Sequence, residues 1–116
     1  MTQPSEINAA FADGFNRRDV DALLALYHAD GAVVEIDGTV SHGAGPIRAH
    51  LERLIAIGGT MTSTNLTTVT VGEIALVTAA WDIVGGSVAP SISGRSAEVL
   101  RRAPDGTWAY LIDQPA

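Results

Sequence analysis

Acidic side chains interrupt several apolar stretches in which the alternation of residues predicts β-strands. Asp113 lies in "WAYLIDQPA", residues 108–116, and Glu98 lies in the strand pattern of residues 94–102. Asp82 belongs to the pattern of residues 74–84, and Glu35 belongs to the short stretch "AVVEID". Side chains alternate between the two faces of a strand. If the acid-bearing faces coincide, these four carboxyl groups would share one concave and mostly apolar surface.

Strict alternation also assigns neighbours to three of these acids. Asp82 shares a face with Leu76, Thr78, Ala80 and Val84, Glu98 with Ser96 and Leu100, and Asp113 with Ala109 and Leu111. The surface would therefore form a pocket with acidic groups in apolar surroundings.

Such a pocket would suit proton transfer. Burial among apolar groups disfavours the charged form of a carboxyl group, and a second carboxylate nearby raises the pKa of one of the pair further. General acid or base catalysis near neutral pH needs a group with such a pKa. We therefore predict Asp113, Glu98, Asp82 and Glu35 as catalytic residues. Asp113 would be the general base, with Glu98 or Asp82 as its acid partner.

Each acid also has a simpler explanation in which water solvates it. Asp82 is near the end of its strand, where a solvated rim position is the alternative. Glu98 would then pair across strands with Arg95 or Arg101 on an exposed face. A frayed C-terminus would leave Asp113 in water. The sequence alone leaves these alternatives open.

Motifs for other kinds of chemistry are incomplete. The three histidines, His28, His42 and His50, lack the paired spacing of metal ligands, so no metal site is predicted. "GAGPIR" lacks the last glycine and the βαβ context of a phosphate-binding loop. "GGSVA" lacks the last glycine of a nucleophile elbow.

The composition limits the classes of function. With 116 residues, 47% hydrophobic and 17% charged, the chain suits one domain over residues 1–116. It contains neither cysteine nor lysine, which excludes thiolate chemistry and Schiff bases. A formal net charge of −6 disfavours nucleic acid and anionic membranes as partners. The sequence shows no membrane span or secretory signal, so the expected location is the cytoplasm.

Three segments have helical periodicity. The first extends from Glu6 to Arg17 and has one apolar stripe. Asp19 is a candidate N-cap for a second helix that continues to Tyr27. The third follows "SHGAG", with Pro46 in its first turn and Gly58 or Gly59 at its C-terminus.

The rest of the pattern is that of strands. "AVVEID", residues 32–37, predicts a short strand, and "HADG" before it predicts a turn. After Thr60 the periodicity changes to two, which predicts strands over residues 61–71, 74–84, 94–102 and 107–114. An antiparallel meander preceded by three helices predicts an α+β domain with the helices on one face of a curved sheet.

A family resemblance supports this fold class. The segment "FADGFNRRDVDALLALYHADGAVVEIDGTVSHGAGPIRAHLERL" resembles the opening of NTF2-like proteins, particularly the SnoaL-like and ketosteroid-isomerase-like members. "GTWAYLIDQP" resembles the last strand of small SgcJ-like and DUF4440-like proteins. The resemblance covers nearly the whole chain. It implies a cone in which a curved, mostly antiparallel sheet wraps the helices around an apolar cavity, and it leaves the activity open because this scaffold hosts many functions.

Some of the functional residues of these families have counterparts in this sequence, and others do not. Glu98 falls where ketosteroid isomerases keep a protonated acid, a case already well known for that family, whereas Phe11 replaces their oxyanion tyrosine. Their general base would correspond to Glu35 or Ile36. Asp113 resembles the last-strand acid of SnoaL-like cyclases. Against limonene epoxide hydrolases, Asp113 and Asp82 resemble the two aspartates, but Ala80 stands where those enzymes have an arginine.

These observations lead to two functional hypotheses. The first is a cofactor-independent isomerase, cyclase or hydrolase acting on a small apolar molecule. The second is a non-catalytic protein that binds such a ligand. The residues predicted to contact the ligand are Phe11, Phe15, Tyr27, Val33, Leu100 and Leu111. No cofactor is predicted, and an apolar outer face of the sheet would favour a homodimer.

Overall fold

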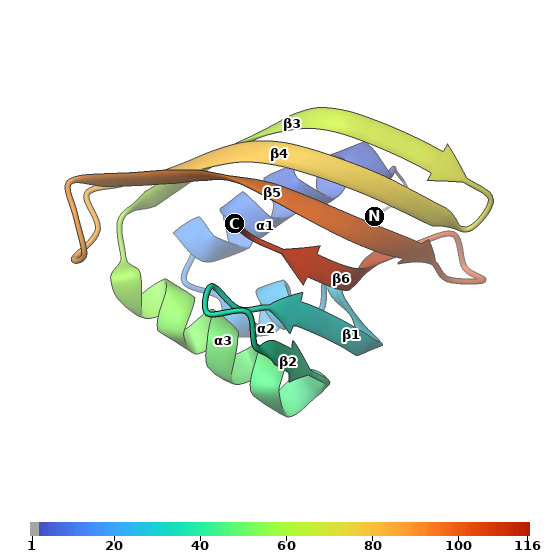
Figure 1. Ribbon diagram of the computed structural model, residues 1–116, viewed down its shortest axis with the longest axis horizontal. Coiled ribbons are helices and arrows are strands. Elements are labelled where there is room, and N and C mark those ends of the chain that lie inside the picture. The colour runs from blue at the N-terminus through green and yellow to red at the C-terminus, as the bar shows by residue number, and fades with distance from the viewer. Residues whose placement is uncertain (1–2) are drawn as a thin grey trace.

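The structure, a computed structural model, describes residues 3–116 and shows a curved sheet with helices on its concave side (Figure 1). A single 3₁₀ turn, η1 (Pro4–Glu6), leads into the helices α1 (Ile7–Asn16) and α2 (Val20–Leu24). The elements that follow are β1 (Tyr27–Val34), β2 (Val40–His42), α3 (Ala44–Ile57), β3 (Thr60–Val71), β4 (Ile74–Val84), β5 (Ser91–Arg102) and β6 (Trp108–Gln114).

The six strands form one sheet in the order β2-β1-β6-β5-β4-β3. Strands β3 to β6 are an antiparallel meander, and β1 pairs with β6 in parallel. Figure 1 shows the long strands arching over α1, with α3 on the side of the short strands β1 and β2. The predicted α+β architecture of three helices on a curved, mostly antiparallel sheet is confirmed.

Apolar faces of the helices hold them against the sheet. Ile7 and Phe15 of α1, Leu23 of α2, and Leu51 of α3 are all fully buried. Ile7, Leu23 and Leu51 belong to one core cluster with the strand residues Val77 and Leu100. Phe15 belongs to a second cluster with Met61 and Ile83. Within residues 3–116, none of the helices has the length and hydropathy that crossing a membrane requires.

The second helix is shorter than its apolar periodicity predicts. The Asp19 side chain caps it by accepting a hydrogen bond from the Ala22 amide, as expected (3.0 Å). However, α2 ends at Leu24, and Tyr27 begins β1. The Leu26 carbonyl accepts a hydrogen bond from the Tyr110 amide in β6 (2.8 Å). Pairing with the sheet thus overrides the local helical pattern.

The beginning of β1 contains a large irregularity that the sequence did not predict. Tyr27 pairs with Tyr110, but the next pair is Ala32 with Ile112, so the "HADG" segment bulges out of the ladder instead of ending a helix. Gly31 lies inside this bulge, where an added Cβ would be 2.9 Å from the His28 carbonyl oxygen and 3.1 Å from that of Tyr110. The edge strand β2, which pairs with β1, was also not predicted.

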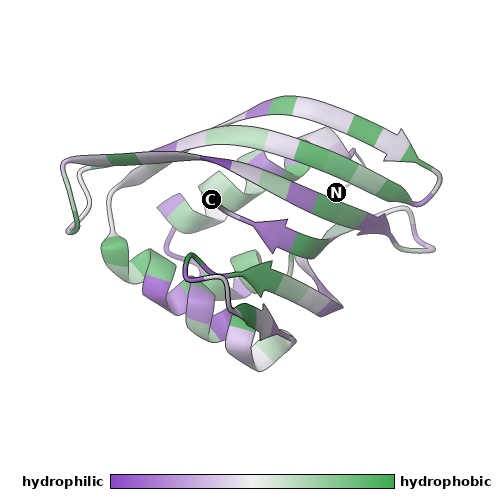
Figure 2. Cartoon of the chain, viewed as in Figure 1, coloured by the Kyte–Doolittle hydropathy of each residue, from purple (hydrophilic) through white to green (hydrophobic). Residues whose placement is uncertain are grey.

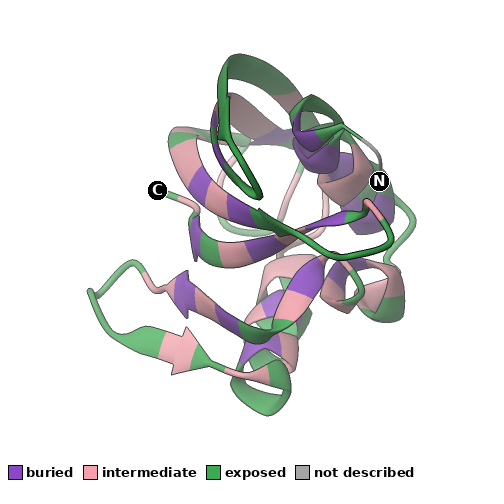
Figure 3. Cartoon of the chain, turned by 90° about the vertical axis from the view of Figure 1, so that its right-hand side faces the viewer, coloured by how far each residue is buried: buried purple, intermediate pink, exposed green. Residues whose placement is uncertain are grey.

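Strand β6 contains a second bulge that changes which side chains point inward. Leu100 pairs with Tyr110 and Val99 pairs with Ile112, so Leu111 is an extra residue. The predicted face of Ala109, Leu111 and Asp113 is therefore wrong. Tyr110 is buried on one side of the bulge and Asp113 on the other. Figure 3 shows buried positions alternating with more exposed ones along the strands. The bulge lets Tyr110 and Asp113 both point into the concave side, although they are three positions apart in sequence.

The burial pattern places charged groups within an otherwise apolar interior. Figure 2 shows the apolar stretches of the strands interrupted by hydrophilic residues, including the end of β6. Among residues 3–116, the buried polar or charged residues are Asn8, Glu98 and Asp113.

The close packing around Gly31 gives a test of the β1 bulge. We expect Gly31→Ala to lower the free energy of unfolding by about 1–3 kcal/mol, because the methyl group would overlap two backbone carbonyl oxygens. Gly45→Ala in α3 is the matched control, since a Cβ there meets nothing within 4 Å; it should leave stability unchanged or raise it by up to about 1 kcal/mol. Urea denaturation measures both. Equal effects of the two substitutions would contradict the described bulge.

Candidate functional site

The three buried polar residues surround a cavity between the helices and the inner face of the sheet. Its volume is about 90 Å³. Its apolar lining is Phe11, Leu54, Met61, Trp81, Ile83 and Pro115, and its polar lining is Asn8, His50, Ser63, Ser96, Glu98, Tyr110 and Asp113. Helices α1 and α3 thus form one side, and strands β3 to β6 form the other.

A chain of hydrogen bonds holds Glu98. The Asn8 amide nitrogen donates to Glu98 Oε1 (2.7 Å), and the Tyr110 hydroxyl donates to Asn8 Oδ1 (2.7 Å). The second carboxyl oxygen, Oε2, is buried and has no hydrogen-bond partner among residues 3–116. Since a buried oxygen without a partner is unfavourable when charged, this arrangement favours the protonated carboxyl group.

The pKa of Glu98 reflects this environment. The pKa is raised from the usual 4.5 to about 7, because burial and, to a smaller extent, the nearby Asp113 carboxylate outweigh the lowering effect of the hydrogen bond from Asn8. Only 1% of Glu98 is exposed. At neutral pH, Glu98 is therefore close to the midpoint of its titration and available as a proton donor.

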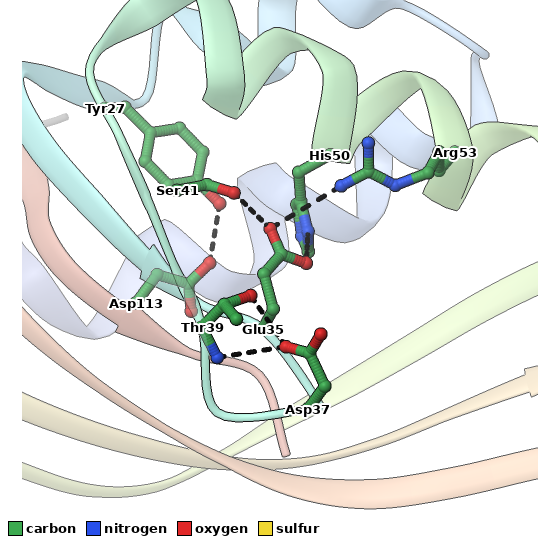
Figure 4. A network of polar contacts seen from close by, with 8 residues as sticks. All are labelled: Tyr27, Glu35, Asp37, Thr39, Ser41, His50, Arg53 and Asp113. Atoms are coloured by element: carbon green, nitrogen blue, oxygen red, sulfur yellow. Dashed lines mark hydrogen bonds and ion pairs between the residues drawn. The ribbon is translucent and has the colours of Figure 1, made fainter.

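Asp113 is held by a different partner. The Tyr27 hydroxyl donates to Asp113 Oδ2 at 2.5 Å (Figure 4). Burial raises the pKa of Asp113 to about 6, although the hydrogen bond from Tyr27 and the charge of His50 act to lower it. A carboxyl group with this pKa is mostly ionised at pH 7, so Asp113 can accept a proton there.

The sheet register places the two carboxyl groups side by side. Glu98 on β5 and Asp113 on β6 are directly paired residues of the antiparallel ladder. Directly opposite side chains on one face of a sheet have Cβ atoms about 4.5–5.5 Å apart. Two like charges at that separation repel each other, and this repulsion adds to the effect of burial in raising the pKa of Glu98. The pKa of Asp113 is raised chiefly by burial.

Glu35 has a supporting position next to the cavity. His50 Nδ1 lies 2.8 Å from Glu35 Oε1, and the Ser41 hydroxyl donates to Glu35 Oε2 at 2.5 Å (Figure 4). Arg53 lies 3.6 Å from the same oxygen. Burial acts to raise the pKa of Glu35, but the hydrogen bonds from Ser41 and His50 and the charge of Arg53 outweigh it, so this pKa is lowered. Glu35 is therefore a carboxylate that contacts His50, and it does not line the cavity.

The prediction that Asp82 shares the cavity face is wrong. On β4 the inward side chains are Ala75, Val77, Ala79, Trp81 and Ile83, which pack against the helices. Asp82 therefore points outward, into a shallow groove that it shares with Thr62, Ser93 and Arg95. Core packing by the larger apolar set decides the orientation of this strand.

Most of the predicted ligand contacts belong to the core instead. Phe11 lines the cavity. Phe15, Val33 and Leu100 are fully buried core residues that do not line it. Tyr27 supports Asp113, and Leu111 is the partly exposed bulge residue of β6. For these five residues the predicted contact with a ligand is not supported by the cavity lining.

Five polar residues of the cavity lining were not predicted as site residues, namely Asn8, His50, Ser63, Ser96 and Tyr110. For two of them the sequence contains a signal. Asn8 is three positions before Phe11 on the apolar stripe of α1, and His50 is four positions before Leu54 on the inner side of α3. A polar side chain on the buried stripe of a helix needs a partner, and here the partners are acids of the site.

Trp81 on β4 is part of the cavity lining. Its ring lies against Gly94 on the neighbouring strand, where an added Cβ would be 2.8 Å from the ring atom Cζ2. The indole Nε1 donates to the Pro115 carbonyl oxygen (2.8 Å). This bond ties the segment after Asp113 to β4.

Comparison with known proteins agrees with this architecture. Residues 8–111 match the SnoaL-like domain family. No curated protein matches the chain in sequence.

Solved structures share the fold at low sequence identity. A ketosteroid isomerase-like protein from Erwinia carotovora superposes with a TM-score of 0.79 at 19% identity, covering 93% of this chain and 88% of that one. An NTF-2-like protein of unknown function from Shewanella oneidensis superposes with a TM-score of 0.78 at 16% sequence identity, covering 94% of this chain and 92% of that one. A proposed dehydratase of the NTF2-like family from Streptomyces avermitilis superposes with a TM-score of 0.73 at 21% sequence identity, covering 95% of this chain and 92% of that one. The predicted NTF2-like cone is thus confirmed.

The raised pKa of Glu98 predicts how stability depends on pH. A carboxyl group that titrates at about 7 when folded and near 4.5 when unfolded stabilises the fold below pH 4.5, and this contribution is lost as the pH rises to 7. Its size is about 3 kcal/mol. We expect Glu98→Gln to remove this dependence, so the variant gains stability relative to wild type between pH 4 and pH 8.

The exposed acid Glu73 provides the matched control for this experiment. Urea denaturation at both pH values gives the free energy of unfolding for wild type, Glu98→Gln and Glu73→Gln. Glu73→Gln should follow the wild type. An identical pH dependence of all three proteins would contradict the raised pKa of Glu98.

Proposed function

Since the chain belongs to the SnoaL-like domain family, we propose that it is a small-molecule enzyme of the isomerase, cyclase or hydrolase type. It would work by carboxylate acid–base chemistry and without a cofactor. The observation that carries this proposal is the pair of adjacent buried carboxyl groups, Glu98 and Asp113, with pKa values of about 7 and 6 in one apolar cavity. Perturbed acids in a cavity are a typical sign of a catalytic site.

The two acids have environments suited to different roles. Asp113 is the general base, because it is mostly ionised at pH 7 and only its Oδ2 is engaged by Tyr27. Glu98 is the proton donor, because about half of it is protonated at that pH. Burial and the adjacent acids keep the pKa of Tyr110 well above its usual value, so its hydroxyl stays protonated. Proton transfer by a positioned group contributes about 10²–10⁴-fold to a rate.

The cavity limits the substrate. A cavity of about 10–15 Å³ already holds one water molecule, so the volume of about 90 Å³ suits a small molecule or one end of a larger one. The aromatic and aliphatic walls favour an apolar body, and the acids favour a polar oxygen at one end. A net charge of −6 disfavours anionic substrates. We therefore propose small, neutral, largely apolar carbonyl compounds as the substrate class.

A non-catalytic binding protein is the second candidate. Hydrogen bonds from Asn8 and Tyr27 hold one oxygen of each acid, and such fixed groups would also orient a ligand that undergoes no reaction. The two functions differ in whether a bound ligand exchanges protons with Asp113.

A general-base role for Asp113 predicts proton exchange on a simple ketone. We expect the wild type to accelerate the replacement of the α-protons of cyclohexanone by deuterium in D₂O, followed by NMR. Asp113→Asn should lower this rate by about 100-fold, because the amide cannot accept the proton. Asp82→Asn is the control on the outer face of the sheet and should retain the rate. Binding of cyclohexanone without accelerated exchange would favour the non-catalytic candidate, and equal rates for wild type and Asp113→Asn would exclude Asp113 as the base.

The outer face of the sheet supports a further part of the proposal, a homodimer. Val69, Leu76, Val99 and Ile112 are successive partners across β3, β4, β5 and β6. Three of these side chains, Val69, Leu76 and Ile112, are exposed to between 43% and 50%. A continuous apolar row across four strands is typical of a surface that another protein covers, and a second copy of the chain is the proposed partner.

A charge in this row should prevent the association. We expect the wild type to sediment as a dimer and Leu76→Arg to sediment as a monomer at the same concentration, because the row would have to bury the guanidinium group. Val88→Arg, in the loop between β4 and β5, is the matched control for an exposed apolar residue outside the row and should stay dimeric. A monomeric wild type would contradict the homodimer.

A further inference from the structure

His50 is part of the cavity wall on the side opposite the sheet. It comes from α3, one helical turn before Leu54, and both residues line the cavity. About 14% of the His50 side chain is exposed, compared with 63% for Arg53 on the same helix. The cavity therefore has polar groups on two walls, with the acids on the sheet and the imidazole on the helix.

Glu35 determines which nitrogen of the His50 imidazole carries the proton. Nδ1 lies 2.8 Å from Glu35 Oε1, and a carboxylate can only accept a hydrogen bond. Nδ1 therefore carries the proton. In the neutral ring, Nε2 is then an acceptor, since a neutral imidazole has one donor and one acceptor nitrogen.

The second ring nitrogen is free for a ligand. Nε2 of His50 has no hydrogen-bond partner within residues 3–116. Among these residues, Glu98 Oε2 is the one side-chain nitrogen or oxygen that is both fully buried and without a partner. Nε2 is therefore at least slightly exposed. Figure 4 shows the His50 side chain extending from α3 toward Glu35. A hydrogen-bond acceptor with a fixed orientation thus borders the cavity.

Glu35 is itself fixed by its neighbours. The Ser41 hydroxyl donates to Oε2 at 2.5 Å, and Arg53 lies 3.6 Å from that oxygen. The carboxylate is only 18% exposed. Because three groups from β2 and α3 converge on Glu35, both the charge of the carboxylate and its position are constrained, and so is the imidazole that it holds.

We propose that His50 determines specificity, with Nε2 accepting a hydrogen bond from a hydroxyl group of the substrate, and that Glu35 is its positioning residue. This inference rests on the proposed function, whose substrate class it narrows. The substrates are small, largely apolar carbonyl compounds that also carry a hydroxyl group. The carbonyl end lies at the acids of β5 and β6, and the hydroxyl group lies at α3.

The donor and acceptor pattern of the cavity supports this substrate class. On the sheet side, the protonated form of Glu98 can donate to a carbonyl oxygen. On the helix side, an acceptor is available. A molecule with a carbonyl group alone would leave Nε2 without a partner once water is displaced, and this loss disfavours binding.

Two similar ketones provide the test. Cyclohexanone and 4-hydroxycyclohexanone differ by one hydroxyl group, and NMR titration of the protein gives both dissociation constants. We expect the wild type to bind 4-hydroxycyclohexanone about tenfold more tightly, a difference typical of one hydrogen bond. In His50→Leu this preference should fall to about one. His42→Gln is the control, since His42 is exposed, lies outside the cavity lining, and forms a hydrogen bond with the Asp30 carbonyl oxygen.

A second measurement tests the role of Glu35 without any ligand. Correlation of ring protons and nitrogens by ¹H–¹⁵N NMR at pH 8 reports which nitrogen of His50 carries the proton. We expect the Nδ1–H tautomer in the wild type and in Ser41→Ala, and a shift toward Nε2–H in Glu35→Ala. A merely structural role of Glu35 would not change this signature.

The outcomes separate this inference from the proposed function. Equal affinities of the wild type for the two ketones, failure to bind either ketone, or an Nε2–H tautomer in the wild type would overturn the inference. The proposed function is judged separately, by whether proton exchange depends on Asp113. A preference for the hydroxylated ketone without such exchange would support His50 as a specificity residue of a binding protein.

Discussion

The forced proximity of two buried acids is the constraint on which the rest of the site depends. The β5–β6 ladder pairs Glu98 with Asp113 on the concave face, where neither is well solvated. Placing one charge there is unfavourable, and placing two is more so. The structure offsets this with separate donors for the two acids, Asn8 from α1 and Tyr27 from the start of β1. The polar interior therefore depends on elements from both ends of the chain.

The two acids are held in different ways, and this difference gives the cavity its chemical asymmetry. Asp113 receives a hydrogen bond from a hydroxyl group, whereas Glu98 receives one from an amide and keeps a second oxygen without a partner. The pKa of Asp113 is about 6 and that of Glu98 is about 7. Between these two pH values, Asp113 is mostly ionised and Glu98 is mostly protonated. A pair of acids with separated titrations is the usual arrangement for opposite proton-transfer roles.

The fold was largely predictable from the sequence because its signals are local. Helical periodicity predicted α1 and α3, and period-two alternation predicted the four long strands, with β4 found at Ile74–Val84 as expected. For Glu98 and Asp113 the sequence left open whether they lie inside or in water, and the structure shows that both are buried. The polar site residues on the helices, Asn8 and His50, were missed. The partner of Asn8, for example, is 90 positions away in the chain, so no local pattern contains it.

The errors arose where tertiary contacts override strict alternation. Alternation predicted that Leu111 and Asp113 share a face, but the bulge at Leu111 brings Tyr110 and Asp113 to the same side. For Asp82, alternation separated the two faces of β4 correctly, but only packing decided which face is inside. A bulge depends on the partner strand and on the bend of the sheet, so the sequence of one strand does not specify it.

The contact between Trp81 and Pro115 gives the protein a built-in optical reporter. Indole emission depends on the polarity around the ring and on the partner of its N–H group, and the Trp81 ring borders the cavity while its Nε1 bonds to the chain just beyond Asp113. The second tryptophan, Trp108, is buried in the core and does not line the cavity. Fluorescence of the unlabelled protein therefore contains one signal that senses occupancy and one that serves as an internal reference.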